Sequence, residues 1–201
     1  MPQIASAALT AIAAYLLGSI PFAVLSSRLF GLADPRTYGS GNPGATNVLR
    51  SGNKKAAILT LIGDALKGVI AVLAARALTH DENLVAIAGI AAFVGHVFSV
   101  FLRFRGGKGV ATAGGVLLAM HWPVGVATLA CWIFIAATTR YSSAAALVSA
   151  LASPFLTAWL FPQASWVVAV AVMALILIWR HWANIGRLFS GQESKLGKKK
   201  A

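Results

Sequence analysis

Long apolar runs alternate with short polar stretches along the whole chain. Seven runs are predicted to be helices, and they cover residues 6–28, 56–78, 84–102, 109–121, 123–139, 143–161 and 165–180. Several approach the ~20 residues that an α-helix needs to cross a bilayer. The runs are continuous and do not alternate between apolar and polar positions, which disfavours a membrane β-barrel. The pattern predicts an all-α integral membrane protein with seven transmembrane helices in a single domain, residues 1–201.

The composition agrees with this pattern. The chain is 58% hydrophobic and 11% charged, with a mean hydropathy of +0.77, which is outside the range of an ordinary soluble domain. The first run contains GSIPF at residues 18–22, and this motif predicts a kink that neighbouring helices must satisfy. The single cysteine, Cys131, has no partner for a disulfide and is expected to be a small core residue.

Positive charge is distributed unevenly between the two alternate sets of loops. Of the 17 Lys and Arg residues, 14 belong to one set: Arg36, Arg50, Lys54, Lys55, Arg103, Arg105, Lys108, Arg140, Arg180, Arg187, Lys195, Lys198, Lys199 and Lys200. Arg28 ends the first run on the same side, whereas Lys67 lies within a run and Arg76 near the opposite end. Because cytoplasmic loops are enriched in Lys and Arg, the N-terminus is predicted outside and the C-terminus in the cytoplasm. That arrangement requires an odd number of membrane crossings, and seven crossings satisfy this requirement.

The end of the chain, residues 190–201, is expected to be a basic and flexible cytoplasmic tail. Its lysines predict attraction to anionic lipid headgroups. Nucleic acid is not an expected partner, despite a net charge of +12, because the apolar runs leave no soluble module to carry it.

The longest loop of the positive set, residues 38–55, reads YGSGNPGATNVLRSGNKK. Glycine permits backbone conformations in which successive N–H groups cradle an anion. The candidate ligands for a phosphate are Ser40, Gly41, Asn42, Gly44, Thr46, Asn47 and Arg50. A helix is expected to begin near Asn53, with its positive end toward the loop. An ordinary surface loop is the alternative, and a nucleotide-binding P-loop is not expected because G-x-x-x-x-G-K-[ST] does not occur.

A second loop on the same face repeats this chemistry. In LRFRGGKGVATAGG, residues 102–115, Lys108 lies between Gly107 and Gly109. A flexible backbone around one lysine permits close approach to a phosphate, although a positively charged membrane turn has the same composition. Two glycine loops that share one face favour the phosphate interpretation.

Two shorter elements add donors to this face. The motif RYSS, residues 140–143, contributes Arg140 and Ser143. If residues 180–193 are helical, His181, Asn184 and Arg187 recur every three residues and share one side of the helix.

Carboxylates are scarce, which bears on the mechanism. The chain has five acids, whereas a metal-dependent phosphotransferase needs several clustered carboxylates, so neither a metal nor a cofactor is expected. Asp64 and Lys67 are three residues apart within an apolar run and are predicted to form a structural ion pair. His96, late in the third run, is expected to be a structural histidine.

These motifs together resemble the bacterial family of membrane-integral, PlsY-type acyl-phosphate:glycerol-3-phosphate acyltransferases. The resemblance runs nearly end to end and rests on YLLGSIPF, DPRTYGSGNPGATNVLR, GDALKG, GHVFSVFLRFRGGKGVATAGG, RYSS and HWANIGRLFSGQE. Some positions depart from the family pattern, namely Ser99, Arg105, Ala144, Ala146 and Trp182. The changes at 144 and 146 leave open which serine near Ser143 is functional.

The resemblance implies transfer of a fatty acyl group from acyl phosphate to the sn-1 hydroxyl of glycerol 3-phosphate, giving lysophosphatidic acid and inorganic phosphate. It implies acyl phosphate ligands among Ser40, Gly41, Asn42, Gly44, Thr46 and Asn47. It implies that glycerol 3-phosphate is held by Arg50, Lys108, Ser143, His181 and Asn184. The candidates for catalytic residues are Lys108, Ser143, His181 and Asn184. The general base stays open between His181 and a substrate phosphate oxygen. The expected setting is a monomer in the bacterial inner membrane, with membrane lipids and the enzyme that supplies acyl phosphate as candidate partners.

Two other classes of protein remain as alternatives. A transporter of phosphate or an organophosphate shares the cations, but internal repeats and a midplane site are typical of that class, and no repeat is found here. A lipid-binding scaffold explains the basic face but not two glycine loops with ordered amide and hydroxyl donors.

Overall fold

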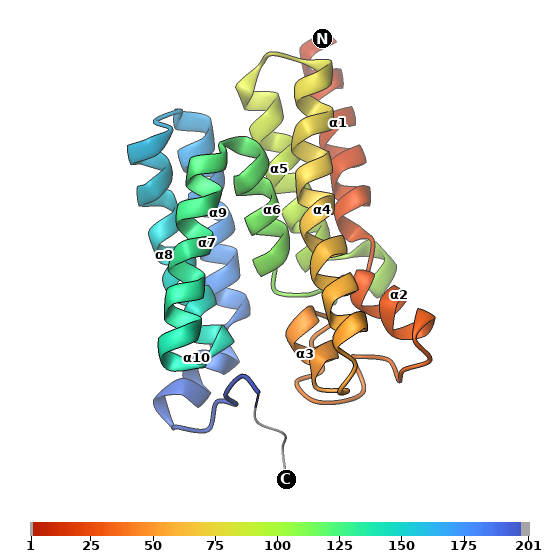
Figure 1. Cartoon of the computed structure of the whole chain (residues 1–201). Coiled ribbons are helices and arrows are strands. Elements are labelled where there is room, and N and C mark those ends of the chain that lie inside the picture. Colours follow the sequence, from red (N-terminus) through yellow and green to blue (C-terminus); the bar gives the residue numbers. More distant parts are fainter. Residues whose placement is uncertain (1, 198–201) are drawn as a thin grey trace.

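The computed structural model describes residues 2–197, and every regular element in that range is helical. The elements are α1 (Pro2–Ser19), α2 (Phe22–Leu29), α3 (Ala45–Leu49), α4 (Lys54–Leu78), α5 (Glu82–Val97), η1 (Val100–Leu102, a 3-10 turn), α6 (Val110–Met120), α7 (Trp122–Thr139), α8 (Ser142–Leu160), α9 (Ala164–Arg180) and α10 (Trp182–Phe189). Figure 1 shows one bundle in which α7, α8 and α9 form one side, α1, α4 and α5 the other, and α6 lies between them. Lys198, Lys199 and Lys200 of the predicted tail lie outside the described residues.

All seven predicted runs are helical, but one helix is short. Five segments are long and apolar enough to span a membrane: Ala5–Leu29, Lys54–Leu78, Glu82–Leu102, Trp122–Thr139 and Ser142–Leu160. A sixth is obtained if α9 and α10, which are bent by 57° at His181, count as one span. The run 109–121 becomes α6, whose 11 residues cover ~16 Å, against a bilayer core of ~30 Å.

The kink predicted in the first run is confirmed. Helix α1 ends at Ser19 and α2 begins at Phe22, because Pro21 has no N–H to continue the helix. Neighbouring helices bond the carbonyls that the break exposes. Lys67 of α4 donates to the Ile20 carbonyl at 3.0 Å, and Ser99 donates to the Ser19 carbonyl at 2.5 Å. Ser99, a departure from the family pattern, thus adds a hydrogen bond inside the membrane-spanning bundle.

Small residues let the helices approach closely. A Cβ atom on Gly18 of α1 would lie 2.0 Å from the Ala92 carbonyl oxygen of α5. A Cβ on Gly115 of α6 would lie 2.0 Å from the Ala65 carbonyl oxygen of α4. Small-residue contacts of this kind are a principal source of helix association in membranes, where lipid tails remove the hydrophobic driving force. They bring α5 and α6 firmly against α1 and α4.

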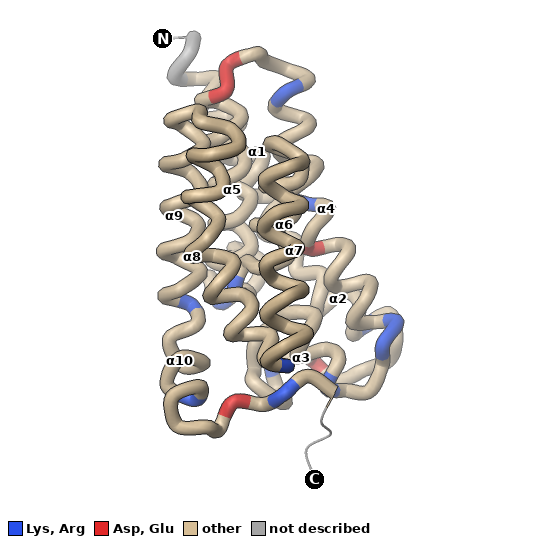
Figure 2. The backbone as a smooth tube through the Cα atoms, turned by 60° about the vertical axis from the view of Figure 1, so that its left-hand side comes forward, with Lys and Arg blue, Asp and Glu red and all other residues tan. Residues whose placement is uncertain are grey.

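Charge separates along the bundle axis. Lys and Arg gather at the end that holds α3 and α10, opposite the N-terminal end of α1 (Figure 2). At the far end, Arg76 pairs with Glu82 at 3.3 Å, and the buried Trp166 indole donates to the same carboxylate at 2.7 Å. The bundle therefore has one strongly basic end.

Part of the glycine-rich segment 38–55 is helical, which sequence reasoning did not predict. Five residues form α3, and Gly44 precedes them in an extended conformation. The helix expected near Asn53 is confirmed, since Asn53 caps α4 by accepting a hydrogen bond from the Ala56 N–H at 3.0 Å. The polar loop is thus folded against the start of α4.

Candidate active site

A cavity of about 360 Å³ lies among the loop before α3, the loop before α6, and α10 with the last residue of α9. Three chain segments line it: Ser40, Gly41, Asn42 and Pro43; Phe104, Arg105, Gly106 and Lys108; and Arg180, Ala183, Asn184 and Arg187. The two glycine loops and the segment after α9, all singled out from the sequence, therefore meet in one place.

The first glycine loop is organised by Asn47. Its Oδ1 accepts hydrogen bonds from the Ser40 N–H at 2.9 Å and from Arg50 at 3.3 Å, and its Nδ2 donates to the Pro35 carbonyl at 2.7 Å. Only 2% of Asn47 is exposed. The amide thus holds the loop from inside and does not line the cavity.

Some of the other predicted residues of this loop line the cavity, and others lie near it. Ser40, Gly41 and Asn42 line the cavity, with Gly41 at φ +67°, a value that favours glycine. Gly44 lies just before α3, and the exposed Thr46 hydroxyl lies 3.4 Å from the Ser142 hydroxyl. Gly44 and Thr46 are therefore near the cavity but not part of its lining.

The second glycine loop presents Lys108 to the cavity. Lys108 Nζ donates to the Asn184 amide oxygen of α10. Burial lowers the pKa of Lys108 to about 8, with nearby guanidinium groups adding to that effect and the Glu193 carboxylate opposing it. Arg180, which also lines the cavity, donates to the Gly106 carbonyl at 3.0 Å. A half-buried cation therefore lines the cavity together with the first glycine loop, and this suits the site to an anion.

Glu193 is a site residue that sequence reasoning missed. Its Oε1 accepts from Ser143 Oγ at 2.7 Å and from Asn184 Nδ2 at 2.5 Å, and its Oε2 accepts from Arg187 Nε at 2.6 Å. Burial raises the pKa of Glu193, but the three hydrogen bonds outweigh it and the net pKa is lowered. The signal in the sequence was its rarity, since Asp34 is the only other acid in the basic loops and tail.

The remaining predicted residues surround the cavity without lining it. His181 is 3% exposed and its Nδ1 lies 2.8 Å from the Leu177 carbonyl oxygen. Arg50 donates to Ser194 Oγ at 2.6 Å. Ser194 and Glu193 belong to 190–201, for which the sequence predicts a flexible tail, and here they contact the folded bundle. Within residues 2–197, no group of three or more His, Cys, Asp or Glu is placed to hold a metal ion.

Comparison with known proteins agrees with this architecture. The glycerol-3-phosphate acyltransferase family model matches residues 8–191. The curated glycerol-3-phosphate acyltransferase of Dechloromonas aromatica (strain RCB) is 55% identical over 193 residues, 96% of this chain and 98% of that protein. That of Ralstonia pickettii (strain 12J) is 58% identical over 205 residues, 100% of this chain and 99% of that protein.

A solved structure extends the likeness to three dimensions. The crystal structure of PlsY (YgiH), an integral membrane glycerol 3-phosphate acyltransferase in its glycerol 3-phosphate form, has a TM-score of 0.89 and 37% identity, and the match covers 96% of each chain. The fold is therefore that of an integral membrane glycerol 3-phosphate acyltransferase. The chain belongs to the PlsY-type glycerol-3-phosphate acyltransferase family.

Proposed function

We propose that this enzyme transfers a fatty acyl group from acyl phosphate to the sn-1 hydroxyl of glycerol 3-phosphate. The observation that carries the proposal is the convergence of both glycine loops and α10 on one basic cavity, with Lys108 between them. Two phosphate-bearing substrates require two anion sites within reach of each other. Family membership supports the acceptor, glycerol 3-phosphate.

The loop at 40–47 is assigned to the acyl phosphate. Ser40, Gly41 and Asn42 line the cavity and supply backbone and side-chain donors to the phosphate. Gly44, Thr46 and Asn47 complete this segment, and Asn47 acts by fixing the loop from inside. The apolar chain of the donor extends into the bilayer along the helices.

Glycerol 3-phosphate is assigned to the donors around α10. Arg50, Lys108, Ser143, His181 and Asn184 hold its phosphate and align its hydroxyl. We add Arg187 to this group, because it lines the cavity and bonds the same Glu193 carboxylate as Ser143 and Asn184. Glu193 orients these donors toward the phosphate.

The reaction needs no covalent enzyme intermediate. The sn-1 oxygen attacks the acyl carbonyl carbon, a new ester C–O bond forms, and the bond from the acyl carbon to the phosphate oxygen breaks. The sn-1 proton passes to a base, for which His181 and a substrate phosphate oxygen are the two candidates. Lys108 neutralises charge on the departing phosphate, so catalysis rests on positioning and fixed electrostatics.

The proposed setting is the bacterial inner membrane, with seven crossings, an external N-terminus and the active site on the cytoplasmic face. The accumulation of Lys and Arg at the α3 and α10 end supports this orientation (Figure 2). In this arrangement α6 is the short fourth crossing, and it leads from the cytoplasmic glycine loop before it toward the outside. We expect the enzyme to act as a monomer among membrane lipids.

The test is an assay of the purified protein with palmitoyl phosphate or palmitoyl-CoA as donor, glycerol 3-phosphate as acceptor, and EDTA present. We expect lysophosphatidic acid and inorganic phosphate in equal amounts from palmitoyl phosphate, and no product from palmitoyl-CoA. If lysophosphatidic acid forms only from palmitoyl-CoA, acyl phosphate is not the donor. Uptake of unchanged glycerol 3-phosphate by sealed vesicles, without acylation, would indicate a transporter instead.

A further inference from the structure

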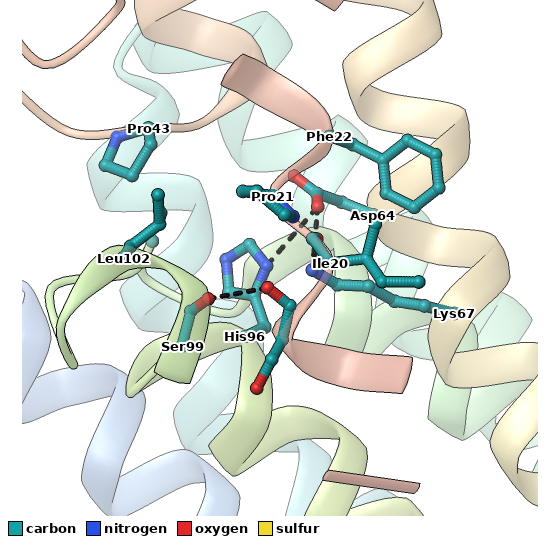
Figure 3. A pocket seen from close by; sticks show the side chains of 11 residues that line it. Ile20, Pro21, Phe22, Pro43, Asp64, Lys67, His96, Ser99 and Leu102 are labelled. Carbon is teal, nitrogen blue, oxygen red and sulfur yellow. Dashed lines mark hydrogen bonds and ion pairs between the residues drawn. The ribbon is translucent and has the colours of Figure 1, made fainter. Parts of the chain in front are cut away.

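Asp64, Lys67 and His96 form a buried polar cluster next to the two glycine loops (Figure 3). Asp64 Oδ1 lies 2.9 Å from Lys67 Nζ and 3.4 Å from His96 Nδ1. The three residues are 3%, 2% and 7% exposed, respectively. The ion pair predicted between Asp64 and Lys67 is confirmed. Charged groups inside an apolar bundle are costly, so the cluster calls for a role beyond filling space.

The cluster ties together the helices that support the site. Lys67 of α4 bonds the Ile20 carbonyl at the break between α1 and α2. The Asp64 carbonyl of the same helix accepts a hydrogen bond from Thr112 of α6 at 2.8 Å. Helix α6, which follows the Lys108 loop, and the break between α1 and α2 are therefore both anchored to one turn of α4.

His96 extends this anchoring to the loops themselves. The Gly107 N–H donates to the His96 carbonyl at 3.1 Å, and the Gly106 N–H donates to the Val97 carbonyl at 3.0 Å. A Cβ atom on Gly107 would lie 2.2 Å from His96 Nε2 and 3.1 Å from the Pro43 carbonyl oxygen. The ring thus packs against the backbone one residue before Lys108, where the two glycine loops touch.

The two ring nitrogens of His96 face different partners. Nδ1 faces the Asp64 carboxylate, and Nε2 faces Gly107. Figure 3 shows the ring between Asp64 and the loop that carries Pro43. The carboxylate therefore fixes which edge of the ring meets the loops, and Lys67 fixes the carboxylate.

We propose that His96 is a positioning residue for acyl transfer, oriented by Asp64 and Lys67, and that it sets the spacing between the two glycine loops. Its ring determines how far Lys108 stands from the first loop, which the proposed function assigns to acyl phosphate. The inference rests on that proposed function for the role of Lys108. His96 itself does not line the cavity.

The test measures the binding of glycerol 3-phosphate by calorimetry, with no acyl donor present. His96→Asn keeps an amide near Asp64 but removes the ring edge that meets Gly107, and Gly107→Ala adds a methyl group against that edge. We expect each change to weaken binding at least tenfold. The double variant is expected to bind no more weakly than either single variant, because both changes act through one contact. The values of kcat are expected to fall as well, since Lys108 serves both substrates.

A matched control separates positioning from general stability. His121→Ala removes a partly buried ring at the far end of the bundle, where it stacks on Phe161 at 4.9 Å, and is expected to lower thermal stability without changing affinity. Wild-type affinity in folded His96→Asn, or fully additive losses in the double variant, overturns the inference. Normal binding of glycerol 3-phosphate without acylation by palmitoyl phosphate refutes the proposed function instead.

Discussion

Lys108 and Asn184 hold each other across the cavity, the ammonium donating to the amide oxygen although the two residues are 76 positions apart. Asn184 also donates to Glu193, which in turn accepts from Ser143 and Arg187. The cation is therefore one end of a continuous hydrogen-bonded chain. The position of Lys108 depends on α10 as much as on its own loop. Its pKa depends on burial and on the charges of Glu193, Arg187, Arg180 and Arg50.

The pKa of Lys108 predicts an alkaline limit for activity. Because burial lowers this pKa from 10.5 to about 8, the ammonium is lost as the pH rises through about 8. The kcat/KM for glycerol 3-phosphate is expected to fall across that range. A bound substrate phosphate stabilises the protonated form of Lys108, so kcat should fall at a higher pH than kcat/KM does.

Unfolding does not account for this limit. Between pH 8 and 10.5 the unfolded chain binds the Lys108 proton and the folded chain does not, so this group contributes stability that rises with pH. Lys108→Arg keeps its charge throughout and is expected to show no fall near pH 8. Identical pH profiles for wild type and Lys108→Arg contradict the assignment.

Glu193→Gln is expected to move the alkaline limit to lower pH. The carboxylate opposes the lowering of the Lys108 pKa, and the amide cannot do so. Comparison of kcat/KM against pH in the two proteins measures the displacement, and coincident profiles count against coupling between Glu193 and Lys108. In the wild type, the lowered pKa of Glu193 also predicts stability that is fully present above pH 4.5 and is lost as the pH falls through the folded pKa.

Asn47→Asp is expected to weaken the first glycine loop. The change removes the donor that bonds the Pro35 and Tyr38 carbonyls but keeps the acceptor for Ser40. Loss of a buried hydrogen-bond partner costs about 1–3 kcal/mol. Since 1.4 kcal/mol corresponds to about tenfold, KM for acyl phosphate should rise about fivefold or more. Asn53→Asp is the control, because aspartate caps a helix as well as asparagine does. An equal rise in both variants refutes a specific role for Asn47.

Gly115→Ala is expected to destabilise the bundle. The added methyl group would lie 2.0 Å from the Ala65 carbonyl oxygen, and overpacking of this kind costs about 1–3 kcal/mol. A Cβ atom on the adjacent Gly114 would have no other atom within 4 Å, so Gly114→Ala should be neutral or stabilising. Thermal unfolding in detergent compares the two. Equal midpoints are inconsistent with the close approach of α4 and α6.

The long helices could be predicted from the sequence because each one lies in an almost uninterrupted apolar run. The kink at Pro21 and the helix start near Asn53 could also be predicted from the sequence, since proline and a capping residue act locally. Helix α3 was not predicted, because five residues among glycines carry no periodic signal. Its helical form depends on packing against α4.

The site was only partly predictable for a similar reason. Glycine and cation motifs identified both loops, but Asn47 reads as a ligand in the sequence and turns out to be held inside its own loop. Glu193 was passed over because its function depends on three partners, Ser143, Asn184 and Arg187, that the chain brings together only when folded. Long-range partners of this kind leave no local pattern.

The most direct test of the account compares acyl transfer by Lys108→Ala with that by Lys55→Ala, which removes an exposed cation at the start of α4. Removing one preorganised donor commonly lowers kcat by about 10²–10³, or ~2.7–4 kcal/mol. We expect a loss of that size in Lys108→Ala and none in Lys55→Ala, with palmitoyl phosphate and glycerol 3-phosphate as substrates. A folded Lys108→Ala protein that forms lysophosphatidic acid at the wild-type rate would contradict the claim that this cavity is where acyl transfer occurs.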